Sequence, residues 1–474
     1  MLQVSDSEII QRLREENPWW TAGVGIDREY ADMPRRAYLP NFSRLIDGNG
    51  PNRAVLLVGP RRVGKTIMVF HAIDRLLGEG VPGRDILYLS LETPTYYGQN
   101  LDALLRRFVK MFERPAGTPL YVFFDEIQYL KEWEVHLKSL VDSQRGVHIV
   151  ATGSAAAALK HKSAESGAGR FTEFVLPPLT FSEYLRFTGA EDELIVQDSS
   201  AADAARFRAR DIHGLNDAFV NYINFGGYPE AVFSEAVRRN PRRYIKSDII
   251  DKVLLRDLPS LYGISDVQEL NALFNTVAYN TAQEISVEDL SQSSGVSKPT
   301  INKYLDYLEA AFLIKRLRRV DENAARFRKA MTFKVYLTNP TMRAALFAPL
   351  RAEDAAIGHL VETAVFSQWL HNADYIDSLH YARWKKGEVD LVSLDTQQKP
   401  RFAVEVKWGD RAVDDAKEIK GLLEFARTHK LTRRPLVTTR TITAIQDMGG
   451  VQVEFSPTAL HCYTVSRNTL ERPR

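Results

Sequence analysis

Eight consecutive residues near the start of the chain have the Gly-x4-Gly-Lys-Thr spacing of a phosphate-binding loop. They are Gly59, Pro60, Arg61, Arg62, Val63, Gly64, Lys65 and Thr66. The glycines let the backbone fold so that its N–H groups point at phosphate oxygens, and a following helix N-terminus favours negative charge. Lys65 would reach the β- and γ-phosphates of a bound nucleotide, and the Thr66 hydroxyl would hold Mg²⁺. The alternative interpretation is a glycine-rich turn with an incidental lysine.

The elements expected around this loop are the ones that phosphate binding needs. The apolar run 54–58 predicts a buried parallel strand that leads into the loop. Residues 67–77, which are apolar on one face, predict the helix that leaves it. Strand, loop and helix in this order make nucleotide binding the specific interpretation.

Two adjacent carboxylates follow a second predicted strand at 120–124. Because ligands gather at the carboxyl ends of parallel strands, Asp125 would hold Mg²⁺ through water and Glu126 would be the general base for the attacking water. A strand that runs into an acidic turn is the alternative. A third predicted strand, 147–151, precedes Ser154, whose hydroxyl would sense the γ-phosphate unless Thr-Gly-Ser is an ordinary turn.

A second group of charged residues lies near the end of the sequence. Predicted strands around Asp390 and Glu405 form a hairpin that brings these carboxylates together as hard oxygen ligands for Mg²⁺. Alternation places Lys407 on the same face as Glu405, where it would stabilise or activate a nucleophilic water. The alternative is that these residues are the solvated faces of edge strands.

With the preceding helix that carries Glu362, this arrangement resembles the PD-(D/E)xK nuclease fold. The resemblance implies Glu362, Asp390 and Glu405 as metal ligands, and Asp390, Glu405 and Lys407 as catalytic residues. Nuclease-like folds also persist as binding modules that do not cleave, so the fold follows from the resemblance more directly than the activity does.

Several short motifs resemble, in their order, a large group of prokaryotic AAA-like ATPases whose C-terminal region has long been of unknown function. The motifs are Gly-Pro-Arg-Arg-Val-Gly-Lys-Thr, Phe-Phe-Asp-Glu-Ile-Gln, Thr-Gly-Ser, Gly-Arg, Pro-Leu-Thr-Phe-Ser-Glu-Tyr and Gly-Gly-Tyr-Pro-Glu. The resemblance implies that Arg170 is an arginine finger for a neighbouring copy, and hence a possible homo-oligomer. It also implies that Pro229 packs near the adenine. A surface arginine and a plain turn are the alternatives.

A basic helix-turn-helix pattern lies between these two regions. Residues 285–308 predict two helices around a turn at Gly295, and 313–320 predicts a strand of a winged helix. Between residues 297 and 334, ten Lys/Arg face four Asp/Glu, a local excess of six positive charges. Lys298, Asn302 and Lys303 would face a DNA groove, with Lys315, Arg316, Arg318 and Arg319 on the wing. Winged helices in ATPases also serve as lids or protein contacts.

Length and composition indicate several globular domains. We expect an N-terminal helical segment (1–45), an AAA-type core (46–190), a helical lid or linker (191–264), a winged helix (265–345) and a nuclease-like domain (350–474). The fold class is therefore α/β.

The net charge of +2 gives no global field for nucleic acid, so any basic surface must be local. A single cysteine, Cys462, fits a reducing cytoplasm, and no signal peptide or membrane span is expected.

Together these patterns predict a Mg²⁺-dependent ATP hydrolase coupled to DNA binding and to a metal-dependent nuclease-like domain. The alternative is an ATP-dependent switch whose C-terminal domain docks protein or nucleic-acid partners without cutting. No base-reading residue is identifiable, so ATP rather than GTP rests on the family resemblance.

Overall fold

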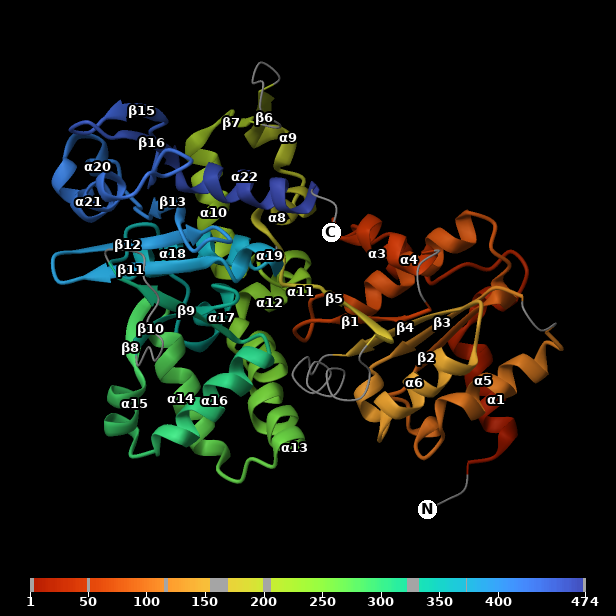
Figure 1. The fold of residues 1–474 in the computed structure, drawn as a ribbon. Coiled ribbons are helices and arrows are strands. Elements are labelled where there is room, and N and C mark those ends of the chain that lie inside the picture. Colours follow the sequence, from red (N-terminus) through yellow and green to blue (C-terminus); the bar gives the residue numbers. More distant parts are fainter. Residues whose placement is uncertain are drawn as a thin grey trace. The chain divides into compact units, whose positions relative to one another are not determined.

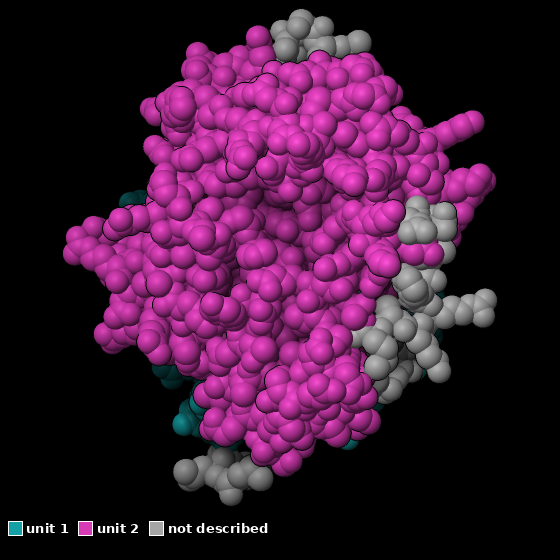
Figure 2. All heavy atoms as spheres, turned by 90° about the vertical axis from the view of Figure 1, so that its left-hand side faces the viewer, with its two compact units in different colours: residues 1–177, 473–474 teal, residues 178–472 magenta. Residues whose placement is uncertain are grey.

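The computed structural model describes residues 4–48, 52–114, 118–153, 169–198, 206–321, 332–371 and 373–471. The chain divides into two compact units, unit 1 (residues 1–177 and 473–474) and unit 2 (residues 178–472), which are coloured separately in Figure 2. The division lies inside the segment 46–190 that we expected to form the ATPase core. Residues 178–190 belong to unit 2, where Phe181 packs with Phe219 and Tyr222.

The described part of unit 1 is built on five parallel strands in the order β2-β3-β4-β1-β5. The strands are β1 (Ala54–Val58), β2 (Ile86–Ser90), β3 (Leu120–Asp125), β4 (Val147–Gly153) and β5 (Phe171–Val175). The helices are α1 (Asp6–Glu16), α2 (Arg28–Ala31), α3 (Leu39–Asp47), α4 (Lys65–Gly78), α5 (Leu101–Met111) and α6 (Trp133–Ser143). Figure 1 shows α3 and α4 on one side of this sheet and α5 and α6 on the other. The predicted α/β architecture of the phosphate-loop region is therefore present.

An N-terminal segment covers the free edge of strand β2. The Asn17 side chain donates to the Tyr88 carbonyl and accepts from the Tyr88 N–H, at 2.8 and 2.7 Å. The Trp20 indole N–H donates to the Ile86 carbonyl at 2.8 Å. An edge strand exposes unpaired backbone groups, and here the side chains of Asn17, Trp19 and Trp20 bond to them. The adjacent tryptophans thus anchor the segment to the sheet.

In the described part of unit 2, nine strands form one sheet in the order β15-β16-β14-β13-β12-β11-β9-β10-β8. They are β8 (Gln283–Ser286), β9 (Ile314–Val320), β10 (Thr332–Leu337), β11 (Leu379–Trp384), β12 (Gly387–Leu394), β13 (Pro400–Glu405), β14 (Leu436–Thr439), β15 (Ala444–Asp447) and β16 (Gln452–Pro457). A separate hairpin joins β6 (Ile195–Asp198) to β7 (Arg206–Ala209). The predicted winged-helix and nuclease-like segments therefore share one sheet, joined where β9 runs parallel to β11.

Helices cover both faces of this sheet. The α-helices of unit 2 are α8 (Phe181–Phe187), α9 (Glu191–Leu194), α10 (Ile212–Phe225), α11 (Pro229–Phe233), α12 (Glu235–Arg239), α13 (Leu258–Tyr262), α14 (Val267–Tyr279), α15 (Val287–Ser294), α16 (Lys298–Ala310), α17 (Thr341–Leu346), α18 (Ile357–Trp369), α19 (Ala373–Ile376), α20 (Arg411–Asp414), α21 (Lys420–Thr428) and α22 (Thr458–Glu471). Helices α8, α10, α18 and α22 contribute to one apolar core, and α20 and α21 to another. Two π-helical stretches, Arg242–Asp251 and Val253–Asp257, lie before α13.

The predicted helix-turn-helix elements are observed as α15 and α16. The turn residue Gly295 has φ +73°, a left-handed conformation that glycine adopts without strain. Ser297 caps α16 by accepting from the Thr300 N–H, and Pro299 lies in its first turn. Ile301, Tyr304, Leu305 and Leu308 face inward as expected. Among the described residues, no helix combines the length and apolarity that a membrane crossing requires.

We predict that Asn17→Ala destabilises unit 1 by about 2 kcal/mol, because it removes the partners of the Tyr88 N–H and C=O groups. The change would be measured as a lower urea midpoint at constant m-value. Gln11→Ala is the control, since the amide of Gln11 contacts only Glu15 on the exposed side of α1 in the hydrogen bonds we observe. Equal midpoints for both variants would contradict the anchoring role of Asn17.

Candidate functional site

The predicted phosphate loop connects β1 to α4 as expected. Arg62 and Gly64 both have left-handed backbones, with φ of 60° and 92°, so the loop turns sharply before the helix. Lys65 begins α4, and its ammonium donates to the carbonyls of Gly59 and Pro60 at 3.1 and 2.8 Å. The lysine is thus held over the loop.

Asp125 lies at the carboxyl end of β3 and is 3% exposed. Three hydroxyl groups donate to its carboxylate: Thr66 at 2.8 Å, Tyr88 at 3.0 Å and Thr152. Burial raises the pKa of Asp125, and the neighbouring Glu126 raises it further, while the three hydroxyl hydrogen bonds oppose the rise. Thr66 and Asp125, predicted to lie on one Mg²⁺, are therefore in direct contact.

Glu126 follows Asp125 in a left-handed conformation with φ 55°. Its N–H donates to the Thr152 hydroxyl at 3.0 Å, and the Gln128 amide donates to its carboxylate. The Glu126 side chain is only partly buried. Thr152 therefore links both carboxylate residues to the end of β4. Neither Thr152 nor Tyr88 had been predicted as a site residue.

The chemistry of these groups fits a magnesium nucleotide. Thr66 and Asp125 supply hard oxygen ligands, Lys65 supplies a cation, and Gly64 begins a helix N-terminus. Gly59 is packed so closely that a Cβ there would lie 2.2 Å from the Leu176 carbonyl oxygen. This position of the loop is thus restricted to glycine.

The other predicted nucleotide-site residues are placed differently. Ser154 lies outside the described residues. The Arg170 carbonyl, just before β5, accepts a hydrogen bond from the Ala54 N–H. Arg170 therefore lies at the amino ends of the parallel strands, whereas Thr66 and Asp125 lie at the carboxyl ends. Its guanidinium pairs with Asp142 at 2.9 Å. Its predicted role as an arginine finger for a neighbouring copy stays a prediction. Pro229 begins α11 in unit 2, and its predicted role at the adenine stays a prediction.

The four predicted nuclease-like residues are brought together in unit 2. Glu362 comes from α18, Asp390 from β12, Glu405 from the end of β13, and Lys407 from just beyond it. All four line one pocket of about 680 Å³. Lys407 contacts Glu405 at 3.0 Å, as alternation predicted. The Lys407 N–H donates to the Thr438 hydroxyl at 2.8 Å, which fixes the backbone there.

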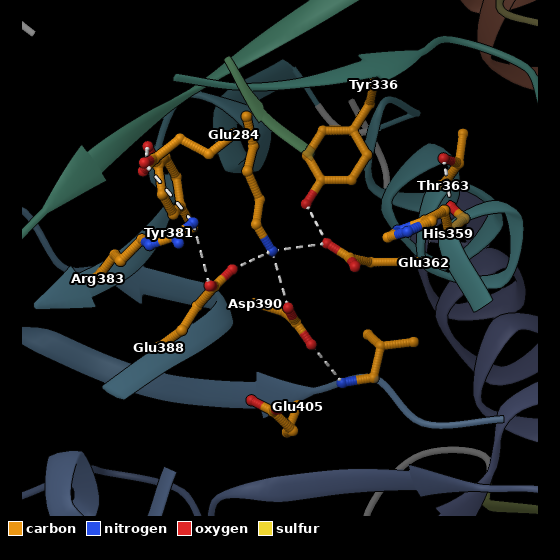
Figure 3. Close-up of polar contacts among 12 residues, drawn as sticks. Glu284, Tyr336, His359, Glu362, Thr363, Tyr381, Arg383, Glu388, Asp390 and Glu405 are labelled. Carbon is orange, nitrogen blue, oxygen red and sulfur yellow. Dashed lines mark hydrogen bonds and ion pairs between the residues drawn. The ribbon is translucent and has the colours of Figure 1, made fainter. Parts of the chain in front are cut away.

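A residue that we had counted only in the basic excess of the wing lies at the centre of this group. The Lys334 ammonium, from β10, is 3.0 Å from Glu362 Oε1 and 2.8 Å from both Asp390 Oδ1 and Glu388 Oε1. Figure 3 shows the three carboxylates converging on this one nitrogen. Lys334 lies in the buried strand Thr332–Leu337. A lysine inside an apolar strand was the sequence signal, because a buried ammonium needs partners.

Burial and charge together perturb these carboxyl groups. Burial raises the pKa of Glu362 to about 7, with Asp390 adding to the rise. Burial, followed by Asp390, also raises the pKa of Glu405. Burial would likewise raise the pKa of Asp390, but the Lys334 ammonium, the Val406 N–H and Lys407 together outweigh it and hold that pKa below its usual value. Glu405 Oε2 is buried without a hydrogen-bond partner among the described residues.

The role of Glu362, Asp390 and Glu405 as metal ligands stays a prediction. The oxygen chemistry of these residues suits Mg²⁺, but Glu362 and Asp390 contact the Lys334 ammonium and Glu405 contacts Lys407. Among the described residues, no three or more His, Cys, Asp or Glu side chains are grouped so that they could hold a metal ion. The carboxylates that we expected to bind metal are partly neutralised by the protein itself.

The predicted DNA-facing residues are only partly free of internal contacts. Asn302 and Lys303 are exposed on α16, and Arg318 is exposed on β9. Lys298 pairs with Glu288, and Arg316 pairs with Glu309 and Asp306. The prediction that Arg316 belongs to the DNA-contacting set is thus weakened, because acidic neighbours already neutralise it.

Three parts of the chain match known families. Residues 51–185 match the family described as AAA domain. Residues 216–354 match Domain of unknown function (DUF8612), and residues 357–454 match Domain of unknown function (DUF4143).

Several relatives match across most of the chain. An uncharacterized protein of Methanocaldococcus jannaschii is 26% identical over 72% of this chain and 72% of its own length. An uncharacterized protein of Haemophilus influenzae is 24% identical, over 77% of this chain and 84% of its own length. A second uncharacterized Methanocaldococcus jannaschii protein is 23% identical, over 81% and 80%.

Among solved structures, C. elegans PCH-2 aligns at a TM-score of 0.28 and 14% identity, covering 58% of this chain and 66% of that one. The S. cerevisiae Hsp104:casein complex aligns at 0.30 and 14%, covering 66% and 55%. The family match and the contact between Thr66 and Asp125 identify residues 51–185 as an AAA-like P-loop ATPase domain.

Proposed function

We propose that the chain is a Mg²⁺-dependent ATP hydrolase. The observation that carries this proposal is the direct hydrogen bond between Thr66 of the phosphate loop and Asp125 at the end of β3. Lys65 would bind phosphate oxygens, Thr66 and Asp125 would hold the Mg²⁺, and Glu126 would accept a proton from the attacking water. When bound, Mg²⁺ would neutralise the negative charge of the phosphates.

We propose further that ATP hydrolysis is coupled to DNA binding through α16 and β9. The exposed side chains of Asn302, Lys303 and Arg318 support this, together with the capped helix that presents the first two. The contact would be made mainly with phosphates, because the exposed groups include two cations.

Metal-dependent DNA cleavage in unit 2 is a second candidate function. The gathering of Glu362, Asp390, Glu405 and Lys407 in one pocket favours it. The Lys334 ammonium among these carboxylates favours the other class of function, a nucleotide switch whose C-terminal region docks a partner without cutting it. Measurements of cleavage and of DNA-stimulated ATP turnover distinguish the two classes.

We predict that Glu126→Gln lowers ATP turnover about 10²- to 10⁴-fold while ATP binding persists, because the variant loses the proton acceptor but keeps the loop. Lys65→Ala is expected to lose both binding and turnover. Steady-state phosphate release and equilibrium binding of a fluorescent ATP analogue would measure the two effects. Lys110→Ala, on the exposed side of α5, is the control. Undiminished turnover in Lys65→Ala would exclude the proposed site.

For DNA binding, we expect Lys303→Ala and Arg318→Ala each to weaken affinity uniformly across sequences and to reduce the salt slope by about 1. Fluorescence anisotropy at several salt concentrations would measure this. Arg316→Ala is the matched control from the same strand, since Glu309 and Asp306 already neutralise Arg316. An unchanged slope in Lys303→Ala and Arg318→Ala would argue that this face binds no DNA.

If unit 2 cleaves DNA, Asp390→Ala is expected to abolish nicking of plasmid or branched DNA in Mg²⁺ while ATP turnover is unchanged. Asp414→Ala, which alters an aspartate of α20 that does not line the pocket, is the control. Absence of cleavage by the wild-type chain, with intact ATP turnover, would favour the docking function.

A further inference from the structure

The ammonium of Lys334 takes the position that a cation would occupy in the acidic pocket of unit 2. Its side chain is 3% exposed and lies within 3.0 Å of oxygens from Glu362, Glu388 and Asp390. A lysine so deeply buried is uncommon unless it is paired, and here three carboxylates pair with it. Figure 3 shows these groups pointing inward from different elements.

The remaining oxygen contacts of Glu362 and Asp390 are made with other protein donors. Asp390 Oδ2 accepts from the Val406 N–H at 2.9 Å. Glu362 Oε1, which already faces Lys334, also accepts from the Tyr336 hydroxyl at 2.7 Å. Two of the three side chains that match nuclease metal ligands therefore already accept hydrogen bonds within the protein.

The spacing of the oxygens also suits an ammonium better than a divalent ion. They lie 2.8 to 3.0 Å from Lys334 Nζ. Mg²⁺ requires about 2.0–2.1 Å and Ca²⁺ about 2.3–2.6 Å. A divalent ion at this position would have to draw the carboxylates inward and displace the ammonium.

The backbone leaves the lysine little freedom to withdraw. Lys334 is paired with Glu284 of β8 on one side and with Leu317 of β9 on the other. It therefore lies inside the ladder rather than on a loop. Moving the ammonium away without breaking these pairings would require the side chain alone to find another place, which leaves a buried charge without its partners.

We propose that Lys334 is the resident cation of this acidic pocket and excludes divalent metal from it, so that removing the ammonium opens a divalent-cation site on Glu362, Asp390 and Glu405. The inference rests on the nuclease-like arrangement proposed above, but it does not require cleavage. Glu405 contributes the buried, unpartnered Oε2 to such a site. The pocket would thus hold its carboxylates together without a bound metal.

The test measures Mn²⁺ binding to the full chain in the absence of nucleotide. The electron paramagnetic resonance signal of the free ion reports how much Mn²⁺ stays unbound. Lys334→Met keeps the length of the side chain and removes its charge. We expect this variant to gain one Mn²⁺ site that binds at least about tenfold more tightly than any site in the wild type that depends on Asp390. Adding Asp390→Asn to Lys334→Met should abolish the gain.

Lys407→Met is the matched control, because it also removes a positive charge from the pocket but from the side of Glu405. The proposal predicts a smaller gain there than in Lys334→Met. Equal gains would mean that net charge alone governs binding, and no gain in Lys334→Met would mean that Lys334 is a structural ion pair only. Either result would overturn the proposal.

A second comparison keeps Lys334 in place, so it does not depend on whether Lys334→Met folds. The proposal predicts that wild type and Asp390→Asn bind Mn²⁺ alike, and tight wild-type binding that Asp390→Asn abolishes would overturn it. Thermal melting and ATP turnover of each variant report folding. A metal site gained in Lys334→Met without any DNA cleavage would leave the inference standing and count against the nuclease function.

Discussion

A carboxylate taken out of water needs hydrogen bonds, a countercharge or a proton, and both candidate sites are organised around this requirement. In unit 1 the buried Asp125 is surrounded by hydroxyl groups from Thr66, Tyr88 and Thr152. In unit 2 the buried Asp390 is held instead by the Lys334 ammonium and a backbone N–H. The two solutions have different consequences for metal binding.

Hydroxyl donors leave a carboxylate able to exchange partners, because each can rotate its hydrogen and offer a lone pair. The Thr66 hydroxyl can therefore turn from donating to Asp125 to coordinating a cation beside it. An ammonium has no lone pair and only donates, so it must be moved rather than turned. The phosphate-loop site is thus prepared for an exchangeable ion, whereas the acidic pocket of unit 2 carries a fixed one.

The features that could be predicted from the sequence are those that depend on residue patterns within one short segment. Strand, loop and helix around Lys65, the carboxylates after β3, and the two helices around Gly295 are all patterns within short segments, and the structure contains each of them. The family match agrees with the first. The roles assigned to Arg170 and Pro229, and the boundaries of the later domains, stay predictions because they depend on contacts beyond such segments.

Lys334 shows why the rest could not be predicted. The sequence analysis counted it only in the basic excess of residues 297–334, and nothing near it in the sequence indicates carboxylate partners 28 to 56 residues further on. Those contacts exist because β9 pairs in parallel with β11, a register that no local periodicity specifies. Tyr88 was missed for the same reason, since Asp125 is its partner across neighbouring strands.

The shared sheet also restricts how unit 2 can respond to a ligand. Helix α16 packs on β9, and β9 is hydrogen-bonded to β10 on one side and to β11 on the other. A hinge between the helix-turn-helix and the acidic pocket would have to break one of these ladders. Any ligand bound on α16 would therefore lie in a fixed orientation relative to the pocket, and communication between them would travel through side chains, with Lys334 on the strand adjacent to β9.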